Sequence, residues 1–206
     1  MLRIIKAFPQ LFFLIVFATF IGACGHKSSI RVLPVYGANI SDTLGKSGVD
    51  HLVSGFKMTD QSGQVITLDT FKNKLFVANF FFASCQGVCI QMNAEMERVE
   101  KTFPGNDRIK FVSYTVTPDA DSVPVLAKYA RAHDAVPFQW YFLRGDKTET
   151  LKLAHTSYLL ETAGFLVHSQ NLTLVDKNRH IRGIYSGTVT SDVDRLIGDI
   201  KILLKE

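Results

Sequence analysis

The sequence has little surplus charge, which excludes one large class of partner. Its 206 residues include 23 Lys and Arg against 19 Asp and Glu, a formal net charge of +4. Arg3 and Lys6 lie in an N-terminal segment that we expect to be removed, so the remainder carries about +2. A phosphate-binding surface needs a much larger positive excess, and we therefore exclude nucleic acid as a partner.

The sequence also lacks the composition of a disordered chain. Apolar residues make up 47% of it and aromatic residues 11%, so there is enough hydrophobic material for a packed core. No internal repeat or low-complexity tract follows the N-terminal region. The length is about that of one domain.

The apolar run near the N-terminus is short for a membrane span, because Pro9 and Gln10 interrupt it. Residues 11–23 carry no charge, but thirteen helical residues cover only about 20 Å of a hydrocarbon core of about 30 Å. With Arg3 and Lys6 before it, this run matches the charged and apolar regions of a secretory signal. A short transmembrane anchor is the alternative.

The run ends in the motif IGAC, which resembles a bacterial lipobox. We therefore predict that residues 1–23 are a lipoprotein signal peptide and that Cys24 is lipidated and becomes the mature N-terminus. The alternative is that Cys24 is simply an apolar residue late in the signal. Residues 24–50 are rich in Gly, Ser and Lys and are predicted to be a lipid-anchored flexible tether. The protein would then be exported and membrane-anchored, facing the periplasm or extracytoplasmic space.

Residues 51–206 alternate between strand and helix patterns. Strands are expected over 56–59, 65–68, 75–82, 109–116, 139–143, 171–175 and 180–185. Helices are expected over 88–103, 121–132, 149–160 and 191–204, the last with Ser191 as its N-cap. This order predicts an α/β domain with a mixed central sheet, helices on both faces and an N-terminal β-hairpin.

Cysteine is scarce, and its placement is informative. After Cys24 only Cys85 and Cys89 occur, where a buried strand ends and a helix begins. Sites in open α/β sheets form at that edge, and a helix N-terminus favours a thiolate. Thiols four residues apart on a first helical turn point the same way, with Cα atoms about 6 Å apart. The pair can therefore form a disulfide or share one metal ion.

The alternative interpretation is that both cysteines are buried and unreactive, since free cysteine is common in protein cores. Against it, these thiols lie close together in a domain predicted to be exported, where thiol pairs are usually oxidised. The sequence therefore favours a functional pair.

The domain resembles the Sco (SenC) family of thioredoxin-like copper-binding proteins over about residues 56–205. The resemblance is carried by the segments DQSGQVITL, NFFFASCQGVC, FVSYTVTPDADSVPVLAKYA, WYFLRG and LVHSQNLTLVDKNRHIRGIYSG. It implies a thioredoxin-like fold and a copper site made by the CxxxC pair and one downstream histidine. By position these ligands are Cys85, Cys89 and His168. Thiolates select Cu(I), and imidazole suits Cu(I) or Cu(II).

The resemblance also implies a function. It indicates a metallochaperone rather than an enzyme, which delivers copper to the CuA site of cytochrome c oxidase or maintains the thiols of that site. The expected partner is the CuA-bearing subunit or another exported thiol or copper protein, and the chain is expected to be a monomer. Three protein ligands would leave copper open to a partner's thiols.

The chain departs from the family pattern at several positions near the site. Gln86 and Ile90 stand where the family has prolines, so the helix start is less rigidly fixed. Thr117 replaces an acid, and Val167 rather than Asp precedes His168. These changes remove acidic groups that could orient the ligands or contact a partner.

A thiol–disulfide oxidoreductase acting on exported partners is the alternative function. Thioredoxin-type enzymes use CxxC and a cis-proline, whereas this chain has CxxxC and no proline between residues 160 and 186. A thiol peroxidase is a third class, for which we find no specific support. The remaining histidines and the methionines at helical spacing are interpreted as surface or core residues: His26, His51, His133, His155, His180, Met92 and Met96.

Overall fold

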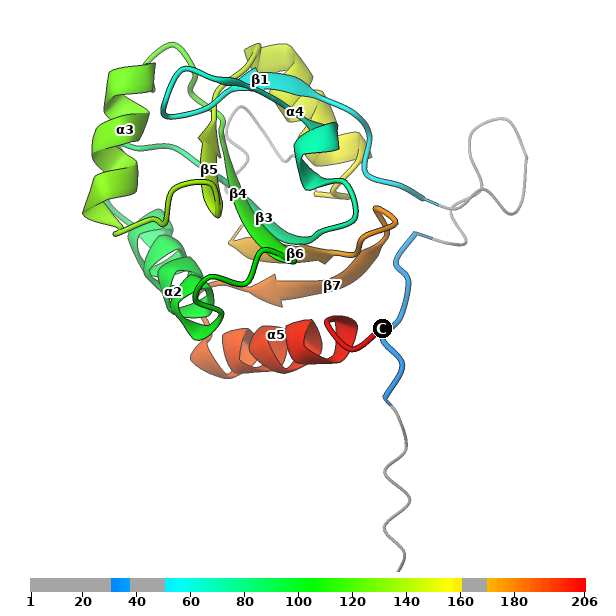
Figure 1. Cartoon of the computed structure of the whole chain (residues 1–206). Coiled ribbons are helices and arrows are strands. Elements are labelled where there is room, and N and C mark those ends of the chain that lie inside the picture. The colour runs from blue at the N-terminus through cyan, green and yellow to red at the C-terminus, as the bar shows by residue number, and fades with distance from the viewer. Residues whose placement is uncertain (1–30, 38–50, 161–169) are drawn as a thin grey trace, which may run out of the picture. The chain divides into compact units, whose positions relative to one another are not determined.

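The computed structural model describes residues 31–37, 51–160 and 170–206. The strands are β1 (Lys57–Thr59), β2 (Val65–Thr67), β3 (Leu75–Phe81), β4 (Ile109–Thr115), β5 (Trp140–Leu143), β6 (Asn171–Val175) and β7 (Ile181–Ser186) (Figure 1). The helices are the 3₁₀ helix η1 (Leu68–Phe71) and α2 (Val88–Thr102), α3 (Val123–Ala132), α4 (Lys147–Thr156) and α5 (Thr190–Leu203). Within these ranges no helix combines the length and apolar character needed to cross a bilayer.

The described strands include a five-stranded mixed sheet in the order β5-β4-β3-β6-β7. β3, β4 and β5 run parallel, while β6 is antiparallel to both β3 and β7. β1 and β2 form the predicted hairpin, with Met58 opposite Ile66, and a bridge from Thr59 to Arg144 joins it to the end of β5. The predicted mixed sheet and hairpin are therefore confirmed.

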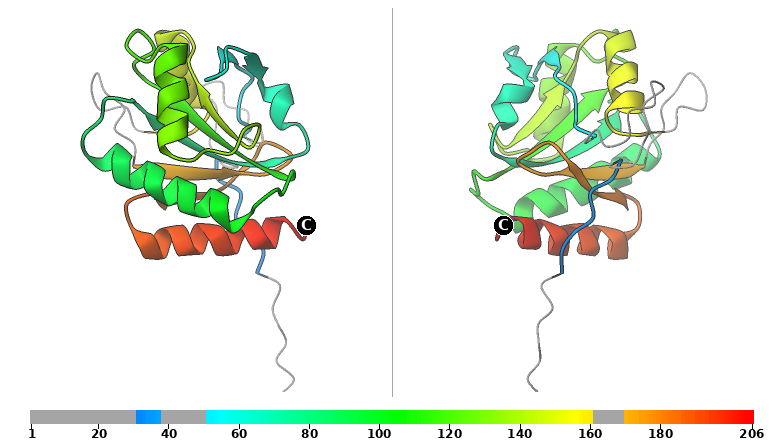
Figure 2. Two further views of the ribbon diagram at one scale, coloured as in Figure 1. Left: turned by 60° about the vertical axis from the view of Figure 1, so that its left-hand side comes forward. Right: turned by 90° about the vertical axis from the view of Figure 1, so that its right-hand side faces the viewer.

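Each central strand contributes side chains to a core on either face of the sheet. Alternate residues of β3, such as Val77 and Phe76, enter different clusters because side chains alternate along a strand. One cluster packs under α2, α3 and α5, and the other under α4, η1 and the hairpin (Figure 2). Because both faces are covered, β3 is apolar at almost every position, as its sequence predicts.

Three helix starts differ from the sequence expectation, and one of them is that of α4, which covers Lys147–Thr156 instead of residues 149–160. α5 begins at Thr190 with Val189 in the cap position and no side chain capping it, so the prediction of Ser191 as N-cap is wrong. α3 begins at Val123 rather than at residue 121, with Pro124 in its first turn. Proline suits that place because it lacks the N–H that a first turn leaves unpaired.

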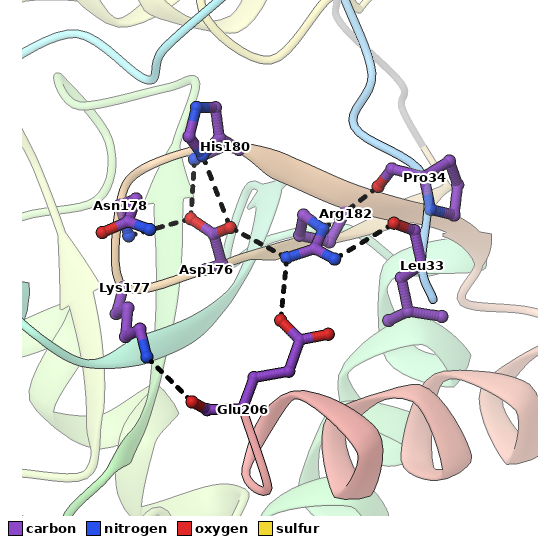
Figure 3. A network of polar contacts seen from close by, with 8 residues as sticks. All are labelled: Leu33, Pro34, Asp176, Lys177, Asn178, His180, Arg182 and Glu206. Atoms are coloured by element: carbon purple, nitrogen blue, oxygen red, sulfur yellow. Dashed lines mark hydrogen bonds and ion pairs between the residues drawn. The ribbon is translucent and has the colours of Figure 1, made fainter. Parts of the chain in front are cut away.

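Arg182 joins both ends of the described domain (Figure 3). This residue of β7 is only 8% exposed, and its guanidinium donates to the carbonyl oxygens of Leu33 at 3.0 Å and Pro34 at 3.1 Å. It also donates to the carboxylates of Asp176 at 3.1 Å and Glu206 at 3.2 Å. Part of the segment predicted as a tether, residues 33–37, therefore packs on the domain instead of being free of it.

The Arg182 cluster lies at one particular edge of the sheet. Ile181, where β7 begins, pairs with Val175, and Val175 pairs with Phe76 near the start of β3. The cluster thus lies at the amino end of β3, and the cysteines follow the carboxyl end of the same strand. Seven residues of β3 separate the two edges by about 20 Å.

We predict that Arg182→Met lowers the free energy of unfolding by about 2–4 kcal/mol. The change leaves two carbonyls and a buried carboxylate without their partner, which costs more than losing the contact alone. Urea unfolding followed by circular dichroism measures it. Arg108→Met, at an exposed position, is the control and should change stability by no more than about 0.5 kcal/mol. Equal losses in the two variants would contradict the anchoring role.

Glu100 of α2 has a buried carboxyl group in which only one of the two oxygens is hydrogen-bonded. Its Oε1 accepts a hydrogen bond from the backbone N–H of Val136 at 3.2 Å, and its Oε2 has no partner. Burial raises the pKa of Glu100 to about 7. Because this pKa is higher in the folded than in the unfolded chain, the folded state binds more protons between about pH 4.5 and 7. Stability therefore decreases as the pH rises through that range.

Glu100→Gln should remove this pH dependence, because the amide remains neutral throughout. Relative to the variant, the natural chain is expected to lose about 2–3 kcal/mol of unfolding free energy between about pH 5 and 8. Urea unfolding at the two pH values tests this. Glu149→Gln, at an exposed position, serves as control and should follow the natural chain. A Glu100→Gln protein with the same pH dependence as the natural chain would refute the assignment.

Candidate metal centre

The two thiols lie at the carboxyl edge of the parallel strands, as predicted. β3 ends at Phe81, which pairs with Thr115 at the end of β4. A short loop follows, and the backbone N–H of Cys85 within it donates to the carbonyl of Phe82 at 3.2 Å. Cys89 is the second residue of α2, whose N-cap is Gly87 without a side-chain cap. Cys85 thus precedes the helix instead of lying on its first turn, a small correction to the sequence expectation.

The pKa values of the two thiols are shifted in opposite directions. Cys89 is 4% exposed, and burial together with the neighbouring Cys85 raises its pKa to about 12. Burial also acts to raise the pKa of Cys85, but this is outweighed by hydrogen bonds from the Cys89 thiol and from backbone N–H groups of Gly87 and Cys89. The pKa of Cys85 is therefore lowered. Cys85 is therefore the thiol that ionises first, and Cys89 keeps its proton.

A buried carboxylate holds the loop of Cys85 against the next strand. Asp121 is 1% exposed, and its Oδ2 accepts hydrogen bonds from the backbone N–H of Ala83 at 3.2 Å and from the hydroxyl of Thr117 at 3.0 Å. The hydroxyl of Thr115 also donates to it. Thr117, which departs from the family pattern, thus takes part in holding the loop through a hydroxyl instead of a carboxylate.

Asp121 was not predicted as a site residue, because the pattern of residues 121–132 indicates a helix that begins at this position. Pro124 was the available signal, since it indicates that the helix begins nearby and that Asp121 precedes it. Asn79, which interrupts the apolar pattern of β3, was likewise a signal for a polar contact in the core. Its amide donates to Asn93 of α2 at 2.8 Å, below the thiols.

The other predicted site residues, His168 and Cys24, lie outside the described residues. Over 31–37, 51–160 and 170–206, no three side chains of Cys, His, Asp or Glu gather into a set that could hold a metal ion. The two cysteines are therefore the part of the predicted ligand set that the described chain brings together. Both are free thiols.

The chain returns to the described region at this same edge. Gln170 accepts hydrogen bonds from the backbone N–H of Gly187 at 2.7 Å and the hydroxyl of Thr188 at 3.0 Å. The carbonyl of Thr188 in turn accepts from the side chain of Gln91 in α2 at 2.9 Å. Gln170 is thereby linked through one residue to the first turns of the helix that carries Cys89.

Residues that we interpreted as structural have structural contacts. Met92 and Met96 are buried in the core, as predicted. His51 and His155 contact the backbone carbonyls of Ser157 and Leu160 at 2.9 and 3.2 Å. The other histidines of this group contact neighbouring side chains, except His26, which lies outside the described residues: His133 packs against Tyr129, and His180 lies beside Asp176.

Comparisons with known proteins agree with this architecture. A sequence model of the SCO1/SenC family matches residues 45–205. The structure is similar to that of a SCO1/SenC family lipoprotein from Bacillus anthracis str. Ames, with 26% identity, a TM-score of 0.67 and coverage of 75% of this chain and 96% of that one.

Two further solved structures are similar. BsSco, described as a member of the Sco family of cytochrome c oxidase assembly proteins with a disulfide switch, is 25% identical with a TM-score of 0.66, covering 73% of this chain and 92% of that one. Copper-bound ScoI of Bradyrhizobium japonicum is 22% identical with a TM-score of 0.60, covering 74% and 99%. The predicted thioredoxin-like fold is therefore confirmed.

The unequal thiols predict unequal reactivity. In the folded, reduced chain at about pH 7, iodoacetamide should modify Cys85 at least about ten times faster than Cys89, because the thiolate is the nucleophile and Cys89 is buried and protonated. Mass spectrometry of the digested protein after timed quenching measures both rates. In concentrated urea the two rates should become similar. Equal rates in the folded chain would disprove the asymmetry.

Proposed function

Since the chain belongs to the SCO1/SenC family, we propose that it is a copper metallochaperone whose cargo is held by Cys85, Cys89 and His168. The observation that carries the proposal is the pair of free thiols that follow β3 at its carboxyl edge and differ in proton affinity. Sulfur donors select Cu(I), and an imidazole ligand suits both copper states.

The proton on Cys89 determines how such a site responds to acid. Both sulfurs must be deprotonated to bind a metal, and the raised pKa of Cys89, about 12, means that copper must displace a firmly held proton. Copper affinity should therefore fall as the pH falls. Three protein ligands leave a coordination position through which a recipient's thiols could take the ion.

His168 is supported by where the chain re-enters the described region. Gln170 is linked to α2 through Thr188, and two residues span at most about 7 Å. His168 precedes Gln170 by two residues in the sequence, whereas His180 lies at the opposite edge of the sheet with Asp176. This is why we favour His168 as the third ligand.

The proposal includes export and membrane attachment through a lipid on Cys24, after removal of residues 1–23. The motif that ends at Cys24 and the lipoprotein description of the Bacillus anthracis relative both support it. The site would then act in the periplasm or extracytoplasmic space. The recipient that we propose is the CuA-bearing subunit of cytochrome c oxidase, in line with the assembly role described for BsSco.

Thiol–disulfide exchange with an exported partner is the second candidate. The specific observation in its favour is the asymmetry of the thiols, because a low-pKa sulfur beside a buried one suits attack followed by resolution. The disulfide switch described for BsSco points the same way for that protein. The two functions use the same pair of sulfurs and differ in whether a metal is retained.

Copper titration of the reduced mature chain tests the metallochaperone. We expect one copper ion per chain, with binding abolished by Cys85→Ser or Cys89→Ser and weakened at least about tenfold by His168→Ala. His180→Ala, at the opposite edge, is the matched control and should bind like the natural chain. Competition with a Cu(I) chelator gives the affinities.

Two results would contradict parts of this proposal. Equal copper affinity in His168→Ala and His180→Ala would remove His168 from the ligand set. Rapid reduction of unrelated disulfides by a chain that retains no copper would favour the oxidoreductase instead.

A further inference from the structure

The edge of the sheet opposite the thiols bears a row of exposed cations. β3, β4 and β5 begin at this edge, and the turn between β6 and β7 lies there too, because Val175 pairs with Phe76 near the start of β3. The cations are exposed, and each lies just before one of these strands or in that turn: Lys72, Arg108, Lys177 and Arg179. Together with Phe138, which lies before β5, we call these residues the amino edge.

Three of these cations surround one hollow. Lys72, Lys177 and Arg179 line a hollow of about 280 Å³. Lys177 donates to the backbone carbonyl of Glu206 at 3.3 Å (Figure 3), whereas Lys72 and Arg179 have no ion-pair partner among the described residues. Asp69 lines the same hollow and offsets one of its three charges. The hollow therefore keeps a positive charge that is open to solvent.

Other acidic side chains near this edge are engaged with other cations. Asp107, for example, lies 2.7 Å from the ammonium of Lys110. Each of the others also contacts at least one cation: Asp134, Asp176 and Glu206. They therefore leave the cations of the hollow able to bind an external anion.

An exposed phenylalanine continues the row at the amino end of β5. Phe138 is 67% exposed, and its φ of +63° lies in the left-handed region that bulky residues rarely adopt. Its carbonyl oxygen accepts hydrogen bonds from the ammonium of Lys110 at 3.0 Å and from the hydroxyl of Tyr141 at 3.1 Å. These contacts hold the backbone in this conformation, while the aromatic ring is left in solvent. Strain that neighbouring groups maintain in this way points to a function of the residue.

The N-terminal segment joins the domain at the same edge. The backbone N–H of Tyr36 donates to the carbonyl of Ile181 at 2.9 Å, and Arg182 holds the carbonyl of Leu33. Leu33 follows Cys24 by nine residues, and a chain of nine residues spans at most about 30 Å. A lipid on Cys24 would therefore keep Leu33 within that distance of the bilayer.

We propose that the amino edge is a docking surface for a membrane that contains anionic phospholipids. Its cations pair with the lipid phosphates, because each Lys or Arg near an anionic surface adds to the attraction. The ring of Phe138 enters the boundary between the phosphates and the acyl chains. A membrane is favoured over an acidic protein because the segment that leads to Cys24 enters here. The inference rests on the proposed export and lipid attachment, which would bring this edge to a bilayer.

Vesicle binding by a chain without an acyl group tests the inference independently of lipid attachment and of copper. The protein is the mature chain, residues 24–206, with Cys24→Ser, so the tether is present in every variant. Its partition coefficient is measured by sedimentation with vesicles of phosphatidylcholine and phosphatidylglycerol and with vesicles of phosphatidylcholine alone. Partitioning into the anionic vesicles should be at least about tenfold stronger at about 50 mM salt, and most of this difference should be lost at about 500 mM.

Removing two cations of the hollow should weaken this binding. Lys72→Gln combined with Arg179→Gln should reduce partitioning about tenfold to thirtyfold, since each cation near the lipid surface contributes about fivefold. The matched control combines Lys128→Gln with Lys147→Gln, two exposed lysines near the carboxyl edge. The control changes the net charge equally and should stay within about twofold of the parent chain.

Phe138→Ala tests the apolar part of the surface separately. It should weaken partitioning at least about threefold, because the ring is then no longer buried among the lipids. Ile90→Ala, at a position 54% exposed beside the thiols, is its control and should change partitioning by less than about twofold. An unchanged partition coefficient in Phe138→Ala would remove that residue from the surface.

Two results would overturn the inference as a whole. The first is equal partitioning of the parent chain into anionic and neutral vesicles at low salt, which would leave an acidic protein as the occupant of this surface. The second is equal weakening in the two double variants, because net charge rather than the amino edge would then determine binding.

Discussion

The chemistry of this domain depends on the different proton affinities of the Cys85 and Cys89 thiols. Hydrogen bonding outweighs burial and lowers the pKa of Cys85, whereas burial raises the pKa of Cys89, so Cys85 ionises first. This division requires that one sulfur precede α2 and that the other lie within its first turn. The end of β3 and the start of α2 therefore have to be held at fixed positions, and much of the surrounding structure serves that requirement.

Buried polar groups supply part of this rigidity. Most of one face of the sheet is apolar or aromatic, but the face under α2 and α3 contains Asn79 and Ser113 among the apolar side chains. A buried amide is costly unless its hydrogen bonds are made. Since the partners come from several elements, the network is fully satisfied only when those elements are correctly packed. Asp121 acts similarly at the edge, where it joins the loop of Cys85 to the end of β4.

Much of the architecture could be predicted from local sequence patterns. The buried run before Cys85, the hairpins and the amphipathic helices all follow from periodicity, and their order specifies a mixed sheet. The start of α5 was misplaced because a serine one residue inside a helix resembles a cap. The contact of Asp121 with Ala83 and that of Asn93 with Asn79 could not be derived, because the partners are 38 and 14 residues apart in the sequence. His168 and Cys24 remain predictions from the family resemblance and the signal motif.

The attachment of residues 33–37 by Arg182 has a geometric consequence for the proposed delivery of copper. Residues 33–37 are bound to the domain at the amino end of β3. This end is about 20 Å from the edge of the sheet that bears the sulfurs. A protein held to a bilayer through that segment can turn its sulfur-bearing edge toward the aqueous compartment without unfolding. In that orientation the sulfurs could reach an acceptor site that lies well above the lipid surface. An acceptor site at the level of the headgroups could be reached only after the whole domain had rotated toward the membrane.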